Sequence, residues 1–172
     1  MPGVAVAYAR DHMATRAILG TDLHLLLDLA RRNDRAPGSD LVLVKRSIAG
    51  GGVAEAVDLD VLTGVENLEQ ALLLRFTTRR GDLAELGHPD YGARLWQLIG
   101  EFNDQTNRNR AKLYALEAIA GEPRVSEVLA IDVRTSPDDR GRIDLAISMR
   151  VIDRPTPLDF VFGIAVLPGG AA

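Results

Sequence analysis

Residues 142–151, with the sequence RIDLAISMRV, decide the fold class of this chain. Every second residue of this stretch is apolar: Ile143, Leu145, Ile147, Met149 and Val151. The residues between them are mostly polar or charged. Alternation with a period of two is typical of an antiparallel strand that turns one face to the core and the other to solvent. The stretch therefore predicts a strand of such a sheet.

Two more strands are predicted on either side of this one. Toward the C-terminus, Pro155 and Pro157 interrupt the pattern, and residues 158–166 then repeat it. Toward the N-terminus, residues 129–134 alternate in the same way, and residues 135–141 contain the turn-forming run Ser-Pro-Asp-Asp. Three consecutive strands with short connections predict an antiparallel meander.

Three helices are predicted before the meander. Thr63 and Glu66 have the spacing of a capping box, and an apolar stripe at helical spacing follows as far as Phe76. A short helix is predicted over residues 90–99 and a longer one over residues 104–120, which begins at a capping aspartate and ends before a glycine. We expect the helices to cover the apolar face of the sheet.

The N-terminal part has weaker patterns. Residues 22–29 alternate and predict a strand, and residues 41–44 form a short apolar run that is typical of another. The whole pattern favours an α+β fold, with an antiparallel sheet of three to four strands and about three helices on one face. We expect an arm over residues 1–18, one domain over 19–167 and a loose tail over 168–172.

Composition narrows the function classes. The chain has 172 residues, of which 47% are hydrophobic, so a single domain can bury a core of its own. Its net charge of −4 makes nucleic acid and anionic membranes poor partners. Cysteine is absent, and the first ten residues do not resemble an export signal. We therefore expect a cytoplasmic protein that binds neither nucleic acid nor membrane.

No metal or cofactor motif is recognisable. The three histidines are far apart in the sequence, without the spacing of metal ligands: His12, His24 and His88. The glycine run 50–52 lacks the Lys-Ser/Thr that follows in a phosphate-binding loop. We expect no metal, no cofactor and a plain surface loop at these glycines.

Four carboxylates deserve comparison with a glycosidase acid–base pair: Glu101, Asp104, Glu117 and Glu122. Each also has an ordinary structural explanation, such as helix capping or exposure on a helix face. No recognisable muramidase sequence surrounds them. The expectation is that the chain has no catalytic residue and is not an enzyme.

The tripeptide Glu122-Pro123-Arg124 lies between the long helix and the strand that follows. Its structural explanation is a corner, in which proline stops the helix, glutamate satisfies a nearby amide and arginine caps carbonyls at the helix end. Its functional explanation is a rigid corner that presents an acid and a cation to a partner. Both explanations remain open on the residues alone.

Other side chains also suit an interface. Arg75, Arg79 and Arg80 lie at helical spacing, either as a solvated face or as a surface that docks an acidic neighbour. Tyr91 is an amphipathic aromatic residue of the kind that interfaces favour, whereas Trp96 is expected to face the core.

A series of spaced motifs resembles one known family. The motifs are GVENLEQA at 64–71, RFTTRRG at 75–81, HPDYG at 88–92 and EPRV at 122–125. In order and spacing they resemble the small baseplate protein of contractile injection machines. This family includes the sheath-initiating wedge subunit of contractile phage tails and its counterpart in type VI secretion. The match runs from about residue 20 to residue 166 and is densest over residues 64–125.

The resemblance implies a fold like a truncated copy of the sheath's interlocking domain. It also implies a structural role in a baseplate, in multiple copies, about six per particle. The partners would be other wedge subunits, the sheath protein of the first ring, and tube or hub proteins as further candidates. In this family the motif at Glu122, Pro123 and Arg124 contacts the wedge, and Arg75, Arg79, Arg80 and Tyr91 are further interface candidates.

Sheath initiation of this kind implies strand addition, in which an open sheet edge accepts an extended arm of another chain. The strands over residues 142–152 and 158–166 are the candidate platforms. Two other classes stay open: a cell-wall hydrolase on a phage tail, since phage members of the family have carried a lysozyme-like label, and a stand-alone small binding domain.

Overall fold

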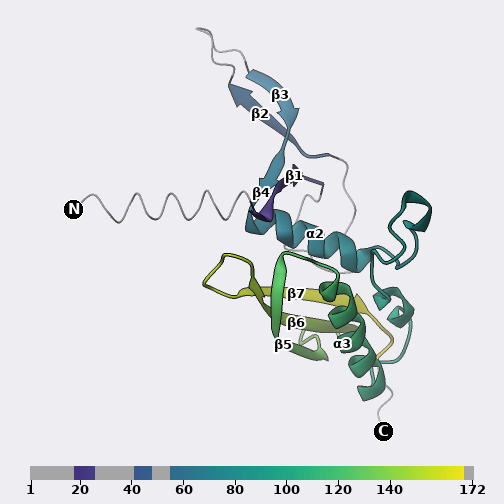
Figure 1. The fold of residues 1–172 in the computed structure, drawn as a ribbon. Helices are drawn as coiled ribbons and strands as arrows, with labels where there is room; N and C mark the ends of the chain where they lie inside the picture. The colour runs from purple at the N-terminus through teal and green to yellow at the C-terminus, as the bar shows by residue number, and fades with distance from the viewer. Residues whose placement is uncertain (1–17, 26–40, 48–54, 169–172) are drawn as a thin grey trace. The chain divides into compact units, whose positions relative to one another are not determined.

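The computed structural model describes residues 18–25, 41–47 and 55–168 (Figure 1). The chain forms two compact units, and the boundary between them falls after Gln70, inside helix α2 (Val65–Thr77). The N-terminal arm and the C-terminal tail that the sequence predicts lie almost wholly outside the described residues.

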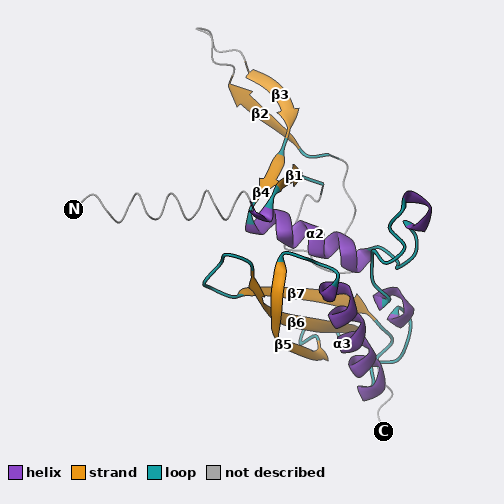
Figure 2. Ribbon diagram, in the orientation of Figure 1, coloured by secondary structure: helices purple, strands orange, loops and turns teal. Residues whose placement is uncertain are grey.

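The second unit contains a three-stranded antiparallel sheet, ordered β5 (Val125–Thr135), β6 (Arg142–Val151) and β7 (Leu158–Ala165) (Figure 2). This is the predicted meander, with β6 in the middle. The core residues follow the predicted alternation in β6 and β7 and are at most 7% exposed: Ile143, Leu145, Ile147, Met149, Val151, Leu158, Phe160, Phe162, Ile164 and Val166.

Strand β5 departs from the predicted alternation. Its register with β6 shifts between Val128 and Ala130, which is the mark of a β-bulge. The extra residue, Leu129, is 40% exposed, whereas Val128 is half-buried. The prediction that Leu129 points inward with Ile131 is therefore wrong, because a bulge reverses the order of faces that a regular strand would keep.

Two complete α-helices occur in the described ranges, α2 and α3 (Gln105–Ala120). Helix α3 begins as predicted, since Asp104 caps it by accepting a hydrogen bond of 2.7 Å from the backbone N–H of Asn107. It packs against β5 and β6. From α2, Phe76 meets Phe160 and Phe162 edge-to-face, with ring centroids 5.7 and 5.3 Å away.

The predicted helix over residues 90–99 does not form. Gly92 has a φ of +101°, which a right-handed helix cannot contain, and only the last part becomes a short 3₁₀ helix, η2 (Leu95–Leu98). A second 3₁₀ helix, η1 (Ala84–Leu86), lies in the preceding loop. The α+β class is thus confirmed, but residues 55–168 contain two α-helices instead of the three that the sequence predicted there.

The first unit contains two separate antiparallel strand pairs. One joins β1 (Thr21–Leu23) to β4 (Val61–Thr63), and the other joins β2 (Leu43–Ser47) to β3 (Glu55–Leu59). Of the predicted strand over residues 22–29, β1 contains only Asp22 and Leu23; residues 24–25 lie outside the strand, and residues 26–29 lie outside the described ranges. In the described residues neither pair adds a strand to the β5–β6–β7 sheet.

Two amide side chains of α2 anchor the segment around β1. Asn67 donates to the backbone carbonyl of Leu19 over 2.9 Å, and Gln70 donates to that of Leu23 over 2.8 Å. Gln70 also accepts from the N–H of Leu25 over 2.8 Å. These amides satisfy backbone groups of Leu19, Leu23 and Leu25 and so attach the segment to α2.

The start of α2 is not the predicted capping box. Thr63 is the last residue of β4 and pairs with Thr21, so the position before the helix belongs to Gly64, with a φ of +67°. No helix in the described part of the chain is both long enough and apolar enough to span a membrane.

Candidate functional site

The Glu122-Pro123-Arg124 corner connects α3 to β5. The N–H of Glu122 donates to the carbonyl of Ile119 over 2.8 Å, and the N–H of Val125 donates to the carbonyl of Glu122 over 3.1 Å. The carbonyl of Arg124 accepts from the N–H of Ile152 over 3.0 Å. These bonds fix the corner to the end of the helix and to the sheet at once.

The Glu122 side chain is only 4% exposed and binds two arginines. Its Oε1 accepts from Nε of Arg124 over 2.6 Å and from the backbone N–H of Arg124 over 3.2 Å, and its Oε2 accepts from Nη2 over 3.0 Å. Nη2 of Arg75 lies 3.6 Å from Oε2. Burial raises the pKa of Glu122, but the hydrogen bonds and charge of Arg124, aided by Arg75, outweigh burial and hold the pKa below its usual value.

Arg75 reaches this corner from the last turn of α2. Its guanidinium lies 4.6 Å from the centroid of the Tyr91 ring, in a cation–π contact. Burial raises the pKa of Tyr91, against the opposing effect of the Arg75 charge. A side chain at Gly121 would place its Cβ 3.0 Å from Nη1 of Arg75, so a glycine leaves room for the arginine.

We call Arg75, Tyr91, Glu122 and Arg124 the corner cluster. It unites two groups of residues that the sequence suggested separately. The acid of the corner faces inward, because the Glu122 carboxylate pairs with Arg75 and Arg124; the contact of this motif with a partner stays a prediction. Pro123 is exposed, and the Arg124 side chain is 23% exposed.

The other two arginines of the predicted basic surface point elsewhere. Arg79 lies over the ring of Trp96, 4.9 Å from its centroid, and Arg80 forms an ion pair with Asp90 at 2.6 Å. Trp96 is 40% exposed, so its predicted core position is wrong. Arg79 and Arg80 lie beyond the end of α2 at Thr77, so they do not continue the helix face that carries Arg75.

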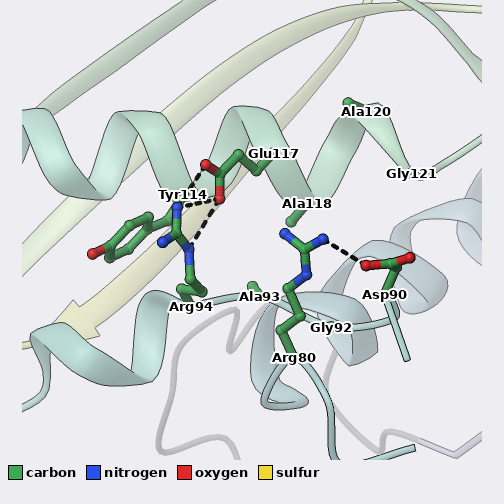
Figure 3. A pocket seen from close by; sticks show the side chains of 10 residues that line it. All are labelled: Arg80, Asp90, Gly92, Ala93, Arg94, Tyr114, Glu117, Ala118, Ala120 and Gly121. Carbon is green, nitrogen blue, oxygen red and sulfur yellow. Dashed lines mark hydrogen bonds and ion pairs between the residues drawn. The ribbon is translucent and has the colours of Figure 1, made fainter. Parts of the chain in front are cut away.

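A pocket of about 240 Å³ lies between the C-terminal part of α3 and residues 80–94 (Figure 3). Arg94 and Glu117 face each other at its side, with N–O distances of 2.6, 2.7 and 3.1 Å. The Glu117 hydrogen bonds raise the pKa of Arg94. Figure 3 also shows Arg80 reaching toward Asp90. Sequence reasoning missed Arg94, because no local pattern indicates a partner on a distant helix.

The four candidate acid–base carboxylates do not converge as a pair. Asp104 caps α3, Glu117 pairs with Arg94, and Glu122 belongs to the corner cluster. Glu101 is exposed, and its backbone carbonyl accepts from Leu167. A general acid needs a raised pKa, and that of Glu122 is lowered. Within the described residues, no three histidines or carboxylates group as metal ligands would.

The outer edge of β7 is the most regular open edge of the sheet. The N–H of Val166 points to β6, since it donates to Gly141, so the backbone groups of alternate residues 159, 161 and 163 point away from β6. No backbone partner from the described residues meets them there. Beyond them, Leu167 pairs with the segment at Phe102.

Strand β6 cannot act as a platform for a foreign strand, although the sequence made it a candidate. Both of its edges are already paired, one with β5 and one with β7. The other free edge, on β5, is interrupted by two register shifts, and such bulges disfavour strand addition. Of the two strands that the sequence made candidates, only β7 therefore offers a regular edge at which a foreign strand could be added.

Comparison with known proteins identifies a similar fold. A crystal structure of a protein from Geobacter sulfurreducens, described as a "putative tail lysozyme", aligns with a TM-score of 0.50 and 23% sequence identity. The alignment covers 62% of this chain and 93% of the other chain. No protein-family model and no curated protein matches the chain. The likeness shows a shared fold.

Proposed function

We propose that this chain is a structural baseplate subunit of a contractile injection machine, which links wedge components to the first sheath ring and nucleates sheath assembly. Two lines support the proposal. The spaced motifs at 64–71, 75–81, 88–92 and 122–125 resemble the baseplate family. The fold is similar to that of a protein whose description places it in a tail.

The open edge of β7 is the observation that carries the proposed mechanism. Backbone N–H and C=O groups at residues 159, 161 and 163 point away from the sheet, without a bulge or a proline to interrupt them. An extended arm of a sheath subunit would form main-chain hydrogen bonds with these groups and take its register from the alternating side chains. Val161, which is 47% exposed, would pack beside the added strand.

The corner cluster supports the wedge contact. Glu122 holds Arg124 through three hydrogen bonds, so this arginine is presented in a defined orientation next to the exposed Pro123. A pre-oriented guanidinium loses less side-chain entropy when it binds a carboxylate. In this proposal Pro123 and Arg124 contact the wedge, and Glu122, Arg75 and Tyr91 position them.

Proline at position 161 tests strand addition. The N–H of Val161 points outward, so Val161→Pro removes a hydrogen bond to an added strand but none to β6. We expect the variant to remain folded while particles carry tubes without an ordered sheath, as counted by electron microscopy. Val161→Thr keeps the N–H and is the matched control, with normal sheaths expected.

Normally sheathed particles with Val161→Pro would reject strand addition at β7.

A hydrolase on a phage tail is the alternative function, since the protein with the similar fold is described as a lysozyme. That alternative requires the purified chain to release soluble fragments from peptidoglycan, and the release must stop when one carboxylate is replaced.

A further inference from the structure

Residues 80–92 form a loop that is closed at its base. The N–H of Ala93 donates to the carbonyl of Thr78 over 2.9 Å, and the N–H of Arg80 donates to the carbonyl of Ala93 over 3.0 Å. The Arg80–Asp90 ion pair bridges the two arms at 2.6 Å. Figure 1 shows this loop in dark teal, standing clear of the β5–β6–β7 sheet. It has the form of an Ω-loop, a class that frequently carries function.

Gly92 keeps the base of this Ω-loop closed. Its φ is +101°, and a Cβ at this position would lie 2.7 Å from the carbonyl oxygen of Thr78 and 2.9 Å from the Arg79 carbonyl group. Only glycine allows so close an approach of the two arms.

The interior of the Ω-loop satisfies its own backbone. The N–H of Ala84 donates to Gly81 over 3.0 Å, that of Leu86 donates to Leu83 over 3.1 Å, and that of His88 donates to Leu83 over 3.0 Å. The loop is therefore pre-organised, and binding through it costs little conformational entropy.

Leu86 stands at the outer turn of the loop and is 74% exposed. A single exposed leucine is common on protein surfaces. Leu86 differs because the closed, hydrogen-bonded loop holds its backbone. It is also the most exposed large apolar side chain among the described residues. A fixed, projecting apolar side chain is suited to fill a recess in another molecule.

The charges of the loop indicate what surrounds that recess. Asp82 and Glu85 are exposed on the same loop, and residues 81–90 contain no lysine or arginine. Asp90, by contrast, is already paired with Arg80. An acidic tip is repelled by nucleic acid and by anionic lipid and attracted by basic groups.

We propose that this Ω-loop inserts Leu86 into an apolar recess on a different protein chain, at a place where lysine or arginine side chains border the recess. Asp82 and Glu85 meet those cations, while Leu86 occupies the recess. The contacting residues Asp82, Glu85 and Leu86 belong neither to the β7 edge nor to the corner cluster, although Tyr91 of that cluster lies on the same loop. The contact can therefore fail or hold independently of the proposed function.

Site-specific photo-crosslinking tests this contact. The photoreactive residue p-benzoylphenylalanine replaces Leu86 in the full chain, made in its own cells under its own promoter, and the same residue at exposed Leu113 of α3 is the control. We expect position 86 to give one dominant product that is absent at position 113. Peptide mapping should place it on another protein, beside apolar residues flanked by lysine or arginine.

Charge neutralisation supplies the second arm of the test. Asp82→Asn with Glu85→Gln should lower the yield of that product about threefold, because two exposed ion pairs are lost. Leu86→Ser should weaken binding to the purified partner roughly tenfold or more, with an unchanged thermal unfolding midpoint. The proposal is overturned if position 86 gives no specific product or crosslinks to a second copy of this chain. It is also overturned if the crosslinked recess has no lysine or arginine beside it, or if neutralising Asp82 and Glu85 leaves the crosslinking yield unchanged.

Discussion

Glu122 shows at the scale of a single residue how a buried carboxylate can organise a corner by holding two arginines. It is nearly fully buried, and it orients Arg124 while drawing Arg75 of α2 to the end of α3. Tyr91 covers the other side of Arg75. A glutamine would keep the shape of the side chain but remove the charge that both arginines require.

Glu122→Gln should therefore destabilise the protein by about 3 kcal/mol at pH 7, because two partly buried cations lose their counter-charge. The folded-state pKa of Glu122 lies below its unfolded value of about 4.3, so the stabilisation is present above that pH and is lost as the pH falls through the folded pKa. Urea unfolding of the parent protein and of Glu122→Gln measures this difference in unfolding free energy. The difference should be smaller at acidic pH than at pH 7. Glu117→Gln, which breaks the more exposed pair with Arg94, should have a smaller effect.

At the scale of elements, the two outer strands of the sheet and the Ω-loop differ in how regular their backbones are. The β7 edge is regular and has no strand partner among the described residues, β5 is bulged, and the Ω-loop of residues 80–92 is closed at its base. Of the glycines in this loop with a positive φ, Gly87 and Gly92 have different surroundings, so the two allow the cost of backbone strain to be measured apart from that of a steric clash. Gly92 lies against the opposite arm, whereas a Cβ at Gly87 would meet nothing within 4 Å.

Gly92→Ala should destabilise the fold by about 2–4 kcal/mol, because it adds a clash with Thr78 to the cost of a positive φ. Gly87→Ala has only the φ cost, about 1 kcal/mol. Guanidinium denaturation of the two variants measures the difference. Equal losses would mean that the base of the loop opens without cost and is not held closed as described.

For the whole molecule, α2 is the element that serves both compact units. Its first part, with Asn67 and Gln70, binds the backbone of residues 19–25. Its second part places Phe76 against Phe160 and Phe162 and Arg75 against Glu122. Each unit thus obtains part of its core from one continuous helix.

Phe76→Ala should reveal whether the units open separately. Loss of the ring should destabilise the second unit by about 3–5 kcal/mol, since both aromatic contacts are lost and a cavity remains. Native-state hydrogen exchange should then accelerate in β6 and β7 and change little in β2 and β3. An equal acceleration in all four strands would show that the two units unfold as one.

Prediction from the sequence succeeded where a pattern is local and regular. The alternation in residues 142–151 and 158–166 indicated the buried faces of β6 and β7, and Asp104 marked the start of α3. It failed where a long-range contact decides the backbone. Residues 90–99 have apolar spacing typical of a helix, but Gly92 is held at a positive φ by the closed base of the loop.

The candidate site divides in the same way. The motif at Glu122, Pro123 and Arg124 was visible in the sequence as a corner with charged residues, as were the nearby arginines. Its internal pairing was not visible, because Arg75 and Glu122 are distant in sequence and meet only when the last turn of α2 comes to the corner that follows α3. The same holds for Arg94 and Glu117.

By itself, the sequence determined the α+β class, the order of the meander and the inward faces of its two C-terminal strands, since hydrophobic periodicity depends only on neighbours along the chain. Only the tertiary structure decided which sheet edge lacks a partner among the described residues, where β5 bulges and which carboxylate holds which arginine. These features depend on distances between segments far apart in sequence, and such distances are set by packing and by the pairing of buried polar groups.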